Sequence, residues 1–257
     1  MMILAIDCGN THITIGCVDS LGTALPVFRI PTDPAETEFG YAVKIKQILD
    51  LEGISLDSLL GAAISCVVPP MTETLVRAAE KLTHTTPLVV GAGVKTGLHI
   101  CINDPGTIAS DLVIAAVAAK AEYPLPCAII DMGTATTMTL LDEKGRFIGG
   151  AILPGTKLSL DALAQRTALL PFTDLTAPKS TVGTNTVDCM KAGILYGSAG
   201  AVDGLLDRFE EQIGTLASIV ATGGLSHVVI PHCRHTITED ETLLLKGLRL
   251  IWEKNRV

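Results

Sequence analysis

The sequence predicts an α/β protein built from two halves of similar architecture. Short apolar segments rich in β-branched residues alternate with longer segments of helical periodicity along the 257 residues, a pattern typical of sheets covered by helices. Two of the short segments share a further feature. "ILAIDCGNTHITIG" runs an apolar strand into Asp7, followed by a glycine and a threonine, and "AIIDMGTATTMTLLD" does the same at Asp131. The repeated strand and loop indicate an internal duplication of architecture.

The first half opens with strands and continues into helices. The segment Asp7–Asn10 lies between two apolar runs as the turn of a β-hairpin, Gly53 supplies a helix stop, and Pro69 closes a buried strand. The elements expected in this half are strands at 2–7, 12–19 and 24–30, a helix at 37–53, a strand at 61–68, a helix at 71–82, a strand at 86–91 and a helix at 110–123.

The second half repeats this order, with Lys144 and Gly145 in a hairpin turn. No low-complexity linker separates the halves, so we expect the helix at 110–123 to be the joint. The predicted domains are therefore an N-terminal domain at 1–112 and a C-terminal domain at 113–257. The elements expected after the joint are strands at 127–133, 137–145 and 146–155, helices at 157–167 and 186–212, a strand at 217–224 and a helix at 240–253.

Composition limits the classes of partner. A net charge of −8 with a pI near 5.2 argues against a nucleic-acid-binding surface. The N-terminus lacks the basic region of a signal peptide, and no apolar stretch is long enough to span a membrane. The seven cysteines are odd in number and scattered, which favours buried, reduced thiols of a cytosolic protein over a disulfide framework. His232, Cys233 and His235 are the tightest group of possible metal ligands, but structural zinc usually needs four, so a surface loop is the favoured interpretation.

An aspartate at a strand end, followed by glycine and threonine, fits a phosphate site. Glycine lets backbone N–H groups approach phosphate oxygens, and threonine offers a hydroxyl. A carboxylate repels phosphates unless a cation lies between them, so Asp7 and Asp131 imply bound metal ions. Each loop alone could equally be a tight hairpin turn. Two such loops, with a third glycine loop "ATGGLS" at 221–226 suited to a purine, favour a nucleotide site.

The ordered set "DCGNT", "DMGTATT", "GGAILPG", "NTVDCMKAG" and "ATGG" resembles the type III pantothenate kinases of bacteria, over nearly the whole chain. That family belongs to the superfamily of actin-like ATPases, sugar kinases and Hsp70. The resemblance implies two ribonuclease-H-like domains, each a mixed sheet with helices and one phosphate loop, with the nucleotide in the cleft between them. It also implies a cytoplasmic homodimer that phosphorylates pantothenate to 4′-phosphopantothenate, the first step of coenzyme A biosynthesis. The expected cofactors are ATP with Mg²⁺ and a monovalent cation, K⁺ or NH₄⁺.

The resemblance also assigns roles to single positions. Asp7 would lie near the magnesium-bound phosphates, Thr134 would contact ATP from the second loop, and Asp131 would bind the monovalent cation. The residues of the first ATP-phosphate loop would be Asp7, Cys8, Gly9, Asn10, Thr11, His12, Ile13 and Thr14.

Asp111 matches the catalytic base that takes the proton from the acceptor's primary hydroxyl, and Thr186 in "NTVD" matches a threonine that touches pantothenate. Asp111 is also a carboxylate in the first turn of a predicted helix, where the helix dipole favours a negative charge, and the two interpretations are compatible. The substrate-binding segment around it would be Ala109, Ser110, Asp111 and Leu112.

The acceptor site departs from the family pattern at three positions. The family usually has a tyrosine two residues before an Asn-Pro pair, and then Gly-x-Asp-Arg. In "CINDPGTIASDL" the tyrosine, glycine and arginine positions hold Ile102, Ala109 and Leu112. Arginine would offer a charged fork of donors to a polar acceptor, and leucine offers none.

Three interpretations of these departures stay open. The protein is a pantothenate kinase whose acceptor is held by other residues, including some of a partner subunit, or a paralogue that phosphorylates a less polar hydroxyl compound, or a nucleotide-binding regulator without kinase activity. The retained Asp111 argues against the third. An actin-like filament protein or a chaperone-like ATPase would need inserted subdomains that 257 residues cannot accommodate.

Overall fold

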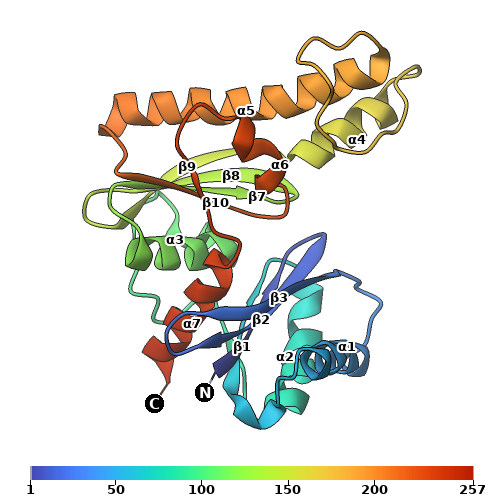
Figure 1. Cartoon of the computed structure of the whole chain (residues 1–257). Helices are drawn as coiled ribbons and strands as arrows, with labels where there is room; N and C mark the ends of the chain where they lie inside the picture. The colour runs from blue at the N-terminus through green and yellow to red at the C-terminus, as the bar shows by residue number, and fades with distance from the viewer. Residues whose placement is uncertain (1, 257) are drawn as a thin grey trace. The chain divides into compact units, whose positions relative to one another are not determined.

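The computed structural model describes residues 2–256, which group into two compact units (Figure 1). The chain enters each unit more than once, because both the helix that begins at Ser110 and the C-terminal helix belong with the first sheet. The division at 112/113 stays a prediction about domains. Unit 1 comprises Met1–Leu98, Asn103–Ala121 and Thr242–Val257, and unit 2 comprises His99–Ile102 and Glu122–Glu241.

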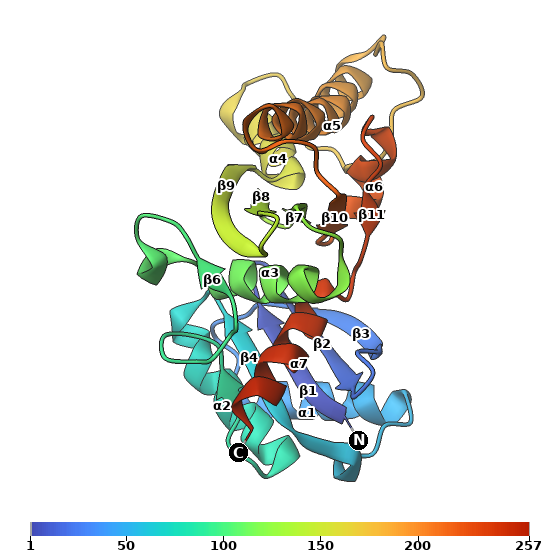
Figure 2. The same cartoon turned by 90° about the vertical axis from the view of Figure 1, so that its left-hand side faces the viewer.

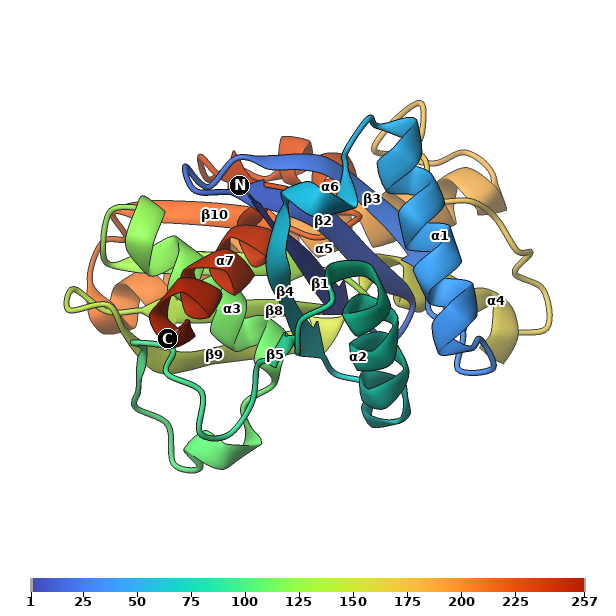
Figure 3. The same ribbon diagram turned by 90° about the horizontal axis from the view of Figure 1, so that it is seen from below.

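Unit 1 is a five-stranded sheet in the order β3-β2-β1-β4-β5 with helices on both faces. The strands β1, β2 and β3 are antiparallel, whereas β4 and β5 run parallel to β1. Figure 3 shows α1 and α2 on one face of the sheet and α7 on the other. The elements are β1 (Met2–Cys8), β2 (His12–Asp19), β3 (Ala24–Pro31), α1 (Glu38–Leu51), η1 (Leu56–Ser58), β4 (Leu59–Cys66), α2 (Pro69–Thr83), β5 (Leu88–Val89), η2 (Pro105–Thr107), α3 (Ser110–Glu122) and α7 (Leu243–Asn255).

The two-residue period of β1 explains this three-layer packing. Leu4, Ile6 and Cys8 project toward one face and join the buried core formed with α1 and α2. The opposite face receives α7, which crosses β1, β2 and β4 (Figure 2). There Gly16 of β2 allows close approach, since a Cβ at that position would lie 2.7 Å from Cδ1 of Leu245.

Unit 2 is a six-stranded sheet in the order β11-β10-β7-β8-β9-β6. Helix α5 runs across one face of it (Figure 1), and its buried residues share a core with β7, β8 and β10. The elements are β6 (His99–Ile100), β7 (Cys127–Met132), β8 (Ala135–Leu141), β9 (Arg146–Pro154), α4 (Thr156–Arg166), α5 (Thr186–Ile213), β10 (Ser218–Thr222), α6 (Ser226–Val229), η3 (Ile230–His232) and β11 (Thr238–Glu239).

The two sheets have the same topology. In each, three consecutive antiparallel strands form a meander, and two later strands add in parallel beside the first strand of that meander. This is the ribonuclease-H-like order 3-2-1-4-5, present twice, with β6 added at one edge of unit 2. The predicted duplication and fold class are confirmed.

Local signals in the sequence placed most elements within a few residues. Gly53 follows α1 at φ +70°, and its neighbour Ile54 donates to the carbonyl of Leu49 (2.9 Å), so the predicted helix stop is confirmed. Gly145, at φ +66°, forms the predicted hairpin turn. The two-residue strands β6 and β11 and the four-residue helix α6 were not predicted, because so few residues show no periodicity.

Two further predictions concerned the cysteine thiols and membrane-spanning helices. The seven cysteines are free, and Cys8, Cys17 and Cys127 are buried, but Cys101 and Cys189 are exposed, so the prediction of buried thiols was wrong for these two. Between residues 2 and 256, no helix combines the length and apolarity needed to cross a bilayer.

Candidate active site

The first candidate phosphate loop connects β1 to β2 in unit 1. Asp7 is the second-last residue of β1 and is 8% exposed. It is paired with Thr14 on β2 and with Ser65 on β4, so a hydroxyl residue flanks the carboxylate on each neighbouring strand. The turn beyond it is closed by the Gly9 N–H, which donates to the carbonyl of His12 (3.0 Å). The sheet therefore presents a carboxylate between two hydroxyl residues at the base of a short loop.

The residues predicted for this loop divide into two groups. Asn10, Thr11 and His12 are exposed and can reach a ligand with their side chains. Cys8 and Ile13 are fully buried in the core with α1 and α2. Any contact of these two with phosphate would come from the backbone alone, which is how such loops approach phosphate oxygens.

The second loop, between β7 and β8 of unit 2, repeats the arrangement. Asp131 is again the second-last residue of its strand, paired with Thr137 on β8 and Thr222 on β10. The loop is again closed by a glycine, since the Gly133 N–H donates to the carbonyl of Ala135 (3.0 Å). The structure thus gives each unit a carboxylate flanked by hydroxyl residues and followed by a glycine turn.

Two further glycines pack directly on this second loop. A Cβ at Gly155 would lie 2.7 Å from the carbonyl oxygen of Gly133, and it would also overlap Thr134. Gly223 has a φ of +95°, and a Cβ there would lie 2.5 Å from Oδ1 of Asp131 and 2.6 Å from the backbone nitrogen of Met132. Only residues without side chains fit here, so both segments are built to hold the loop closely.

The predicted purine loop lies beside the second phosphate loop. It follows β10, which is parallel to β7, so both loops leave the same edge of the sheet. The Leu225 N–H donates to the carbonyl of Met132 (3.3 Å), and the hydroxyl of Ser226 donates to the carbonyl of Gly223 (3.1 Å). The first of these contacts joins the 221–226 loop to the Asp131 loop, and the second closes the 221–226 loop on itself.

The predicted catalytic base lies at the first turn of α3 in unit 1. The hydroxyl of Ser110 is 3.0 Å from the hydroxyl of Ser65, the β4 residue paired with Asp7. Asp111 follows, and its Oδ1 accepts a hydrogen bond from the Leu112 N–H (2.7 Å). Burial raises the pKa of the Asp111 carboxyl, against the opposing effect of this hydrogen bond. A raised pKa makes the carboxylate a stronger base than an exposed aspartate.

The other predicted acceptor residues lie in separate places. Ala109, just before α3, is exposed. Ile102 belongs to unit 2 and is partly exposed. Thr186 is exposed at the first turn of α5, where the side chain of Asn185 caps the helix by accepting from the Asp188 N–H (2.9 Å).

An open groove begins near the start of α5. Its volume is about 610 Å³, and it runs between the segment before the helix and the first three turns of the helix. Its lining is mostly small and apolar, formed by Thr181, Val182, Gly183, Cys189, Ala192, Gly193, Tyr196 and Gly197.

Each loop is suited to phosphate groups that bring their own cation. Mg²⁺ usually keeps several waters and binds one or two carboxylates together with substrate phosphates, so it does not require a preformed cage of ligands. Residues 2–256 contain no group of three or more His, Cys, Asp or Glu side chains that could hold a metal ion. Beside the second loop, the hydroxyl of Thr156 is buried and has no hydrogen-bond partner among the described residues. A buried polar atom without a partner is costly, so a ligand or water at this loop fits the site.

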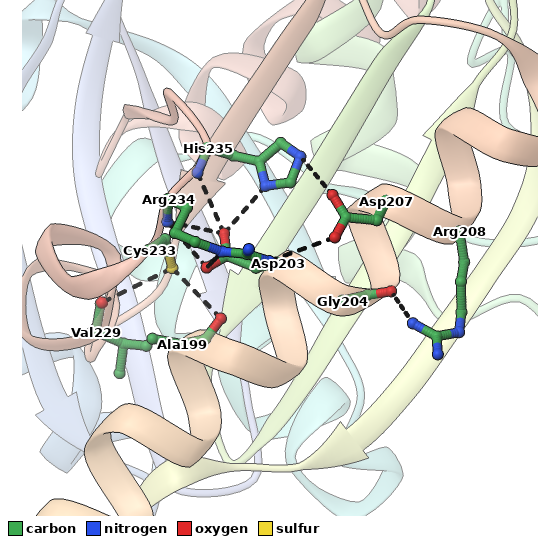
Figure 4. Close-up of polar contacts among 9 residues, drawn as sticks. All are labelled: Ala199, Asp203, Gly204, Asp207, Arg208, Val229, Cys233, Arg234 and His235. Carbon is green, nitrogen blue, oxygen red and sulfur yellow. Dashed lines mark hydrogen bonds and ion pairs between the residues drawn. The ribbon is translucent and has the colours of Figure 1, made fainter.

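The histidine and cysteine cluster at 231–235 has a structural role instead. Asp203 of α5 is buried and accepts hydrogen bonds from the backbone N–H groups of Arg234 (2.9 Å) and His235 (3.2 Å), as Figure 4 shows. The His235 ring lies between two carboxylates, with Nδ1 3.0 Å from Asp203 and Nε2 3.3 Å from Asp207. Burial alone would raise the pKa of Asp203, but these hydrogen bonds, that of His235 first, lower it. The cluster ties the segment after α6 to α5.

Three residues of the site were not identified from the sequence. Ser65, Thr222 and Thr156 are hydroxyl residues that adjoin the loops, and all three are at most 1% exposed. For Ser65 and Thr222 the available signal was a polar residue near the end of an otherwise apolar strand, in "AAISC" and "SIVATGG", whereas Thr156 is the first residue of a helix. That signal says nothing about the strand that will lie alongside, so the pairing with Asp7 or Asp131 could not be read from it.

Comparison with known proteins agrees with this geometry. The family model for type III pantothenate kinase matches residues 3–208. A type III pantothenate kinase of an Exiguobacterium species is 40% identical over 255 residues, covering 99% of this chain and all of the relative. Among solved structures, component A of the (R)-2-hydroxyglutaryl-CoA dehydratase of Acidaminococcus fermentans superposes with a TM-score of 0.60 at 16% identity over all of both chains. A ROK family glucokinase of Streptomyces griseus, in complex with glucose and AMPPNP, gives a TM-score of 0.51 at 15% identity over 99% of each chain. These two likenesses concern the fold.

Proposed function

The chain belongs to the type III pantothenate kinase family, and on that premise we propose that it transfers the γ-phosphoryl group of ATP to the primary hydroxyl of pantothenate, giving 4′-phosphopantothenate. This is the first step of coenzyme A biosynthesis. The observation that supports the proposal best is the Ser65–Ser110 contact, which joins the helix that carries Asp111 to the strand position paired with Asp7. A base for the acceptor hydroxyl and a loop for the phosphates therefore belong to one unit.

The roles of the residues follow from their positions. Asp111 accepts the proton of the attacking hydroxyl, and burial has raised its pKa toward the range in which a base is effective. The exposed turn from Gly9 to His12 directs backbone and side-chain donors at phosphate oxygens. A bound Mg²⁺ would neutralise phosphate charge and lie near Asp7. Phosphoryl transfer depends mostly on such positioning and charge neutralisation, so no covalent intermediate is needed.

We assign a monovalent cation, K⁺ or NH₄⁺, to Asp131. The carboxylate and the neighbouring residues Thr137 and Thr222 offer oxygen atoms, which hard cations prefer. Gly223 approaches Asp131 so closely that it fixes the carboxylate in one position. Thr134, which is exposed, is the proposed ATP contact of this loop, and Thr186 the proposed pantothenate contact.

We also propose that the protein works as a homodimer in the cytoplasm. Glycines at 193, 197 and 200 of α5 have nothing within 4 Å of where a Cβ would be, although each glycine in a helix costs up to about 1 kcal/mol. Close approach by a second helix would explain them. Large apolar side chains are exposed nearby, at Leu158 (50%), Leu169 (90%), Phe172 (71%) and Val182 (75%). The free thiols support a reducing compartment.

The departures in the acceptor site support one second candidate. Leu112 stands where the resembled family has an arginine, and the loss of such a contact to a charged or polar group typically costs about 2–5 kcal/mol. A paralogue that phosphorylates a less polar hydroxyl compound would use the same Asp111 and the same loops. The acceptor is therefore the point that an experiment has to decide.

The test is an ATP-consumption assay with Mg²⁺ and K⁺, with and without pantothenate. Pantothenate-dependent ADP release that is lost in Asp111→Asn, and kept in the matched surface variant Asp57→Asn, is the expected result. ADP release that pantothenate does not stimulate, with ATP binding intact by thermal shift, would reject pantothenate as the acceptor. A protein that fails to bind ATP at all would reject the kinase itself.

A further inference from the structure

Two cysteines face each other beside the first phosphate loop. Cys8 is the last residue of β1 and Cys66 the last residue of β4, and the parallel register pairs them directly. Paired residues of neighbouring strands project to the same face, and the strands lie about 4.7–4.9 Å apart. That separation falls within the Cα–Cα range of about 4.4–6.8 Å that a disulfide spans. The fold therefore presents two thiols in a position to be joined.

The two thiols differ in access. Cys8 is fully buried, whereas Cys66 is partly exposed. Sγ of Cys66 lies 3.2 Å from the carbonyl oxygen of Val68, just before α2 begins. A partly exposed thiol in front of a fully buried one is the arrangement of a reactive and a resolving cysteine.

The pair is mechanically connected to the loop. Cys8 directly follows Asp7, and its carbonyl accepts a hydrogen bond from the Val67 N–H (3.0 Å). The next residue, Gly9, is held by its own turn and by the hydroxyl of Thr32, which donates to the Gly9 carbonyl (2.7 Å). A bond between the two sulfurs would tie the end of β4 to the residue next to Asp7 inside a close-packed core, so the strain would be felt at the backbone beside Asp7.

We propose that Cys66 and Cys8 form an oxidation site, at which a small-molecule disulfide joins them and thereby stops nucleotide binding at the first loop. The Cys66 thiol loses its proton to solvent, and its thiolate attacks one sulfur of the small disulfide RSSR, which gives a mixed disulfide and releases RS⁻. The Cys8 thiol gives its proton to that RS⁻ and attacks Sγ of Cys66, which releases the second RS⁻, and this takes up a proton from solvent. In sum, two protein thiols and RSSR become one protein disulfide and two RSH.

Loss of catalysis on oxidation rests on the proposed function, but formation of the disulfide and loss of ATP binding do not. The purified protein is treated with 2-hydroxyethyl disulfide and digested without reduction, and the linked peptides are identified by mass. Binding of ATP with Mg²⁺ is measured by titration before and after treatment and after addition of dithiothreitol. Two variants are treated alongside, Cys66→Ser and the matched control Cys101→Ser, which removes an exposed thiol of unit 2.

We expect a peptide that links Cys8 to Cys66, an ATP Kd at least tenfold weaker, and recovery with dithiothreitol. Cys101→Ser should behave like the unmodified sequence, and Cys66→Ser should keep its ATP affinity through the treatment. A mixed disulfide that persists on Cys66 without the link would overturn the proposal. A linked protein whose ATP affinity changes less than twofold, or equal loss of affinity in Cys66→Ser, would overturn it as well.

Discussion

Replacing Gly223 by alanine tests whether the Asp131 loop depends on the absence of a side chain. Two costs add at this position. The φ of +95° is unfavourable for an L residue, which costs about 1–2 kcal/mol. The new Cβ would also lie 2.5 Å from Oδ1 of Asp131 and 2.6 Å from the backbone of Met132. Because the backbone atoms belong to the central strand β7, they cannot move aside cheaply, and overpacking of this kind costs about 1–3 kcal/mol.

The matched control is Gly53→Ala. Gly53 has a φ of +70° and nothing within 4 Å of its would-be Cβ, so only the backbone cost applies, about 1–2 kcal/mol. We therefore expect Gly223→Ala to lose about 2–5 kcal/mol. For a chain of this length, each kcal/mol lowers Tm by about 2–4 °C. The measurement is thermal and denaturant unfolding of both variants, with the activity titrated against K⁺.

The activity titration separates the local effect from a general loss of stability. At a temperature where both variants are folded, Gly223→Ala should require more K⁺ for half-maximal activity, because Asp131 has been displaced. Gly53→Ala should respond to K⁺ as the unmodified protein does. If Gly223→Ala loses no more stability than Gly53→Ala and keeps the K⁺ response of the unmodified protein, then the close packing of Gly223 on Asp131 contributes neither to stability nor to the K⁺ response. That result would refute the argument.

Three other predictions concern the base, the packing of α5 and the dimer. Asp111→Asn should lower kcat about 10²–10⁴-fold. Because burial raises the pKa of this carboxyl, its ionised form opposes folding at neutral pH, so the variant should be at least as stable as the unmodified protein at pH 7. The difference in stability should close as the pH falls through the raised pKa, and a variant that is less stable at pH 7 would contradict this reasoning. Asp203→Ala should lose about 3–5 kcal/mol of unfolding free energy and the exposed Asp207→Ala less than about 1. Since the pKa of Asp203 is lowered on folding, its contribution to the free energy of unfolding is present above the unfolded pKa and is lost as the pH falls through the folded pKa. When unfolding is measured at stepwise lower pH, the stability difference between Asp203→Ala and the unmodified protein should therefore shrink. A difference that stays constant with pH would contradict this role of Asp203. Gly197→Trp should convert the proposed dimer into monomers in sedimentation velocity, whereas Glu211→Trp, at the exposed end of the same helix, should not. A dimer that survives Gly197→Trp would reject this face of α5 as the interface.

The fold could be predicted from the sequence because its signals are local and repeated. Each meander opens with a strand that is buried along nearly its whole length and runs into Asp-x-Gly, and the glycines at 53 and 145 end their elements as expected. The C-terminal helix was expected at nearly the right residues, but its packing on the first sheet was not predicted. The periodicity of a helix does not indicate which sheet it will cover. That choice depends on long-range packing, such as Gly16 against Leu245.

The candidate site was predictable only in part, for the same reason. Asp7, Asp131 and Asp111 stand out because each is a carboxylate at the end of an apolar element. Their partners do not stand out, because a parallel pairing such as Asp7 with Ser65 joins strands far apart in the chain. The assignment of all residues from 7 to 14 to the ATP site also did not separate side-chain contacts from backbone contacts. The side chain of Ile13 lies in the core, so only its backbone could contact a ligand.

The duplication gives the two units loops of similar arrangement that differ in length and packing. In unit 1 the turn closes from Gly9 to His12, and the intervening residues are exposed. In unit 2 it closes from Gly133 to Ala135, one residue sooner, and Gly155 and Gly223 press on it from both neighbours. A longer, open turn suits contact with several phosphate oxygens, whereas a short, enclosed one suits a fixed carboxylate.

The same difference explains where a base could arise. In unit 1 the strand beside Asp7 ends near Ser65, whose hydroxyl meets Ser110 at the start of α3 and so brings Asp111 to that edge of the sheet. In unit 2 the strand beside Asp131 ends in Thr222, and the chain continues into Gly223, which packs on Asp131 itself. The helix that follows, α6, begins at Ser226, whose hydroxyl donates to the carbonyl of Gly223. On the proposed roles, chemistry at unit 1 and charge neutralisation at unit 2 would be two outcomes of one topology, and the segment that packs against the end of the fourth strand would decide between them.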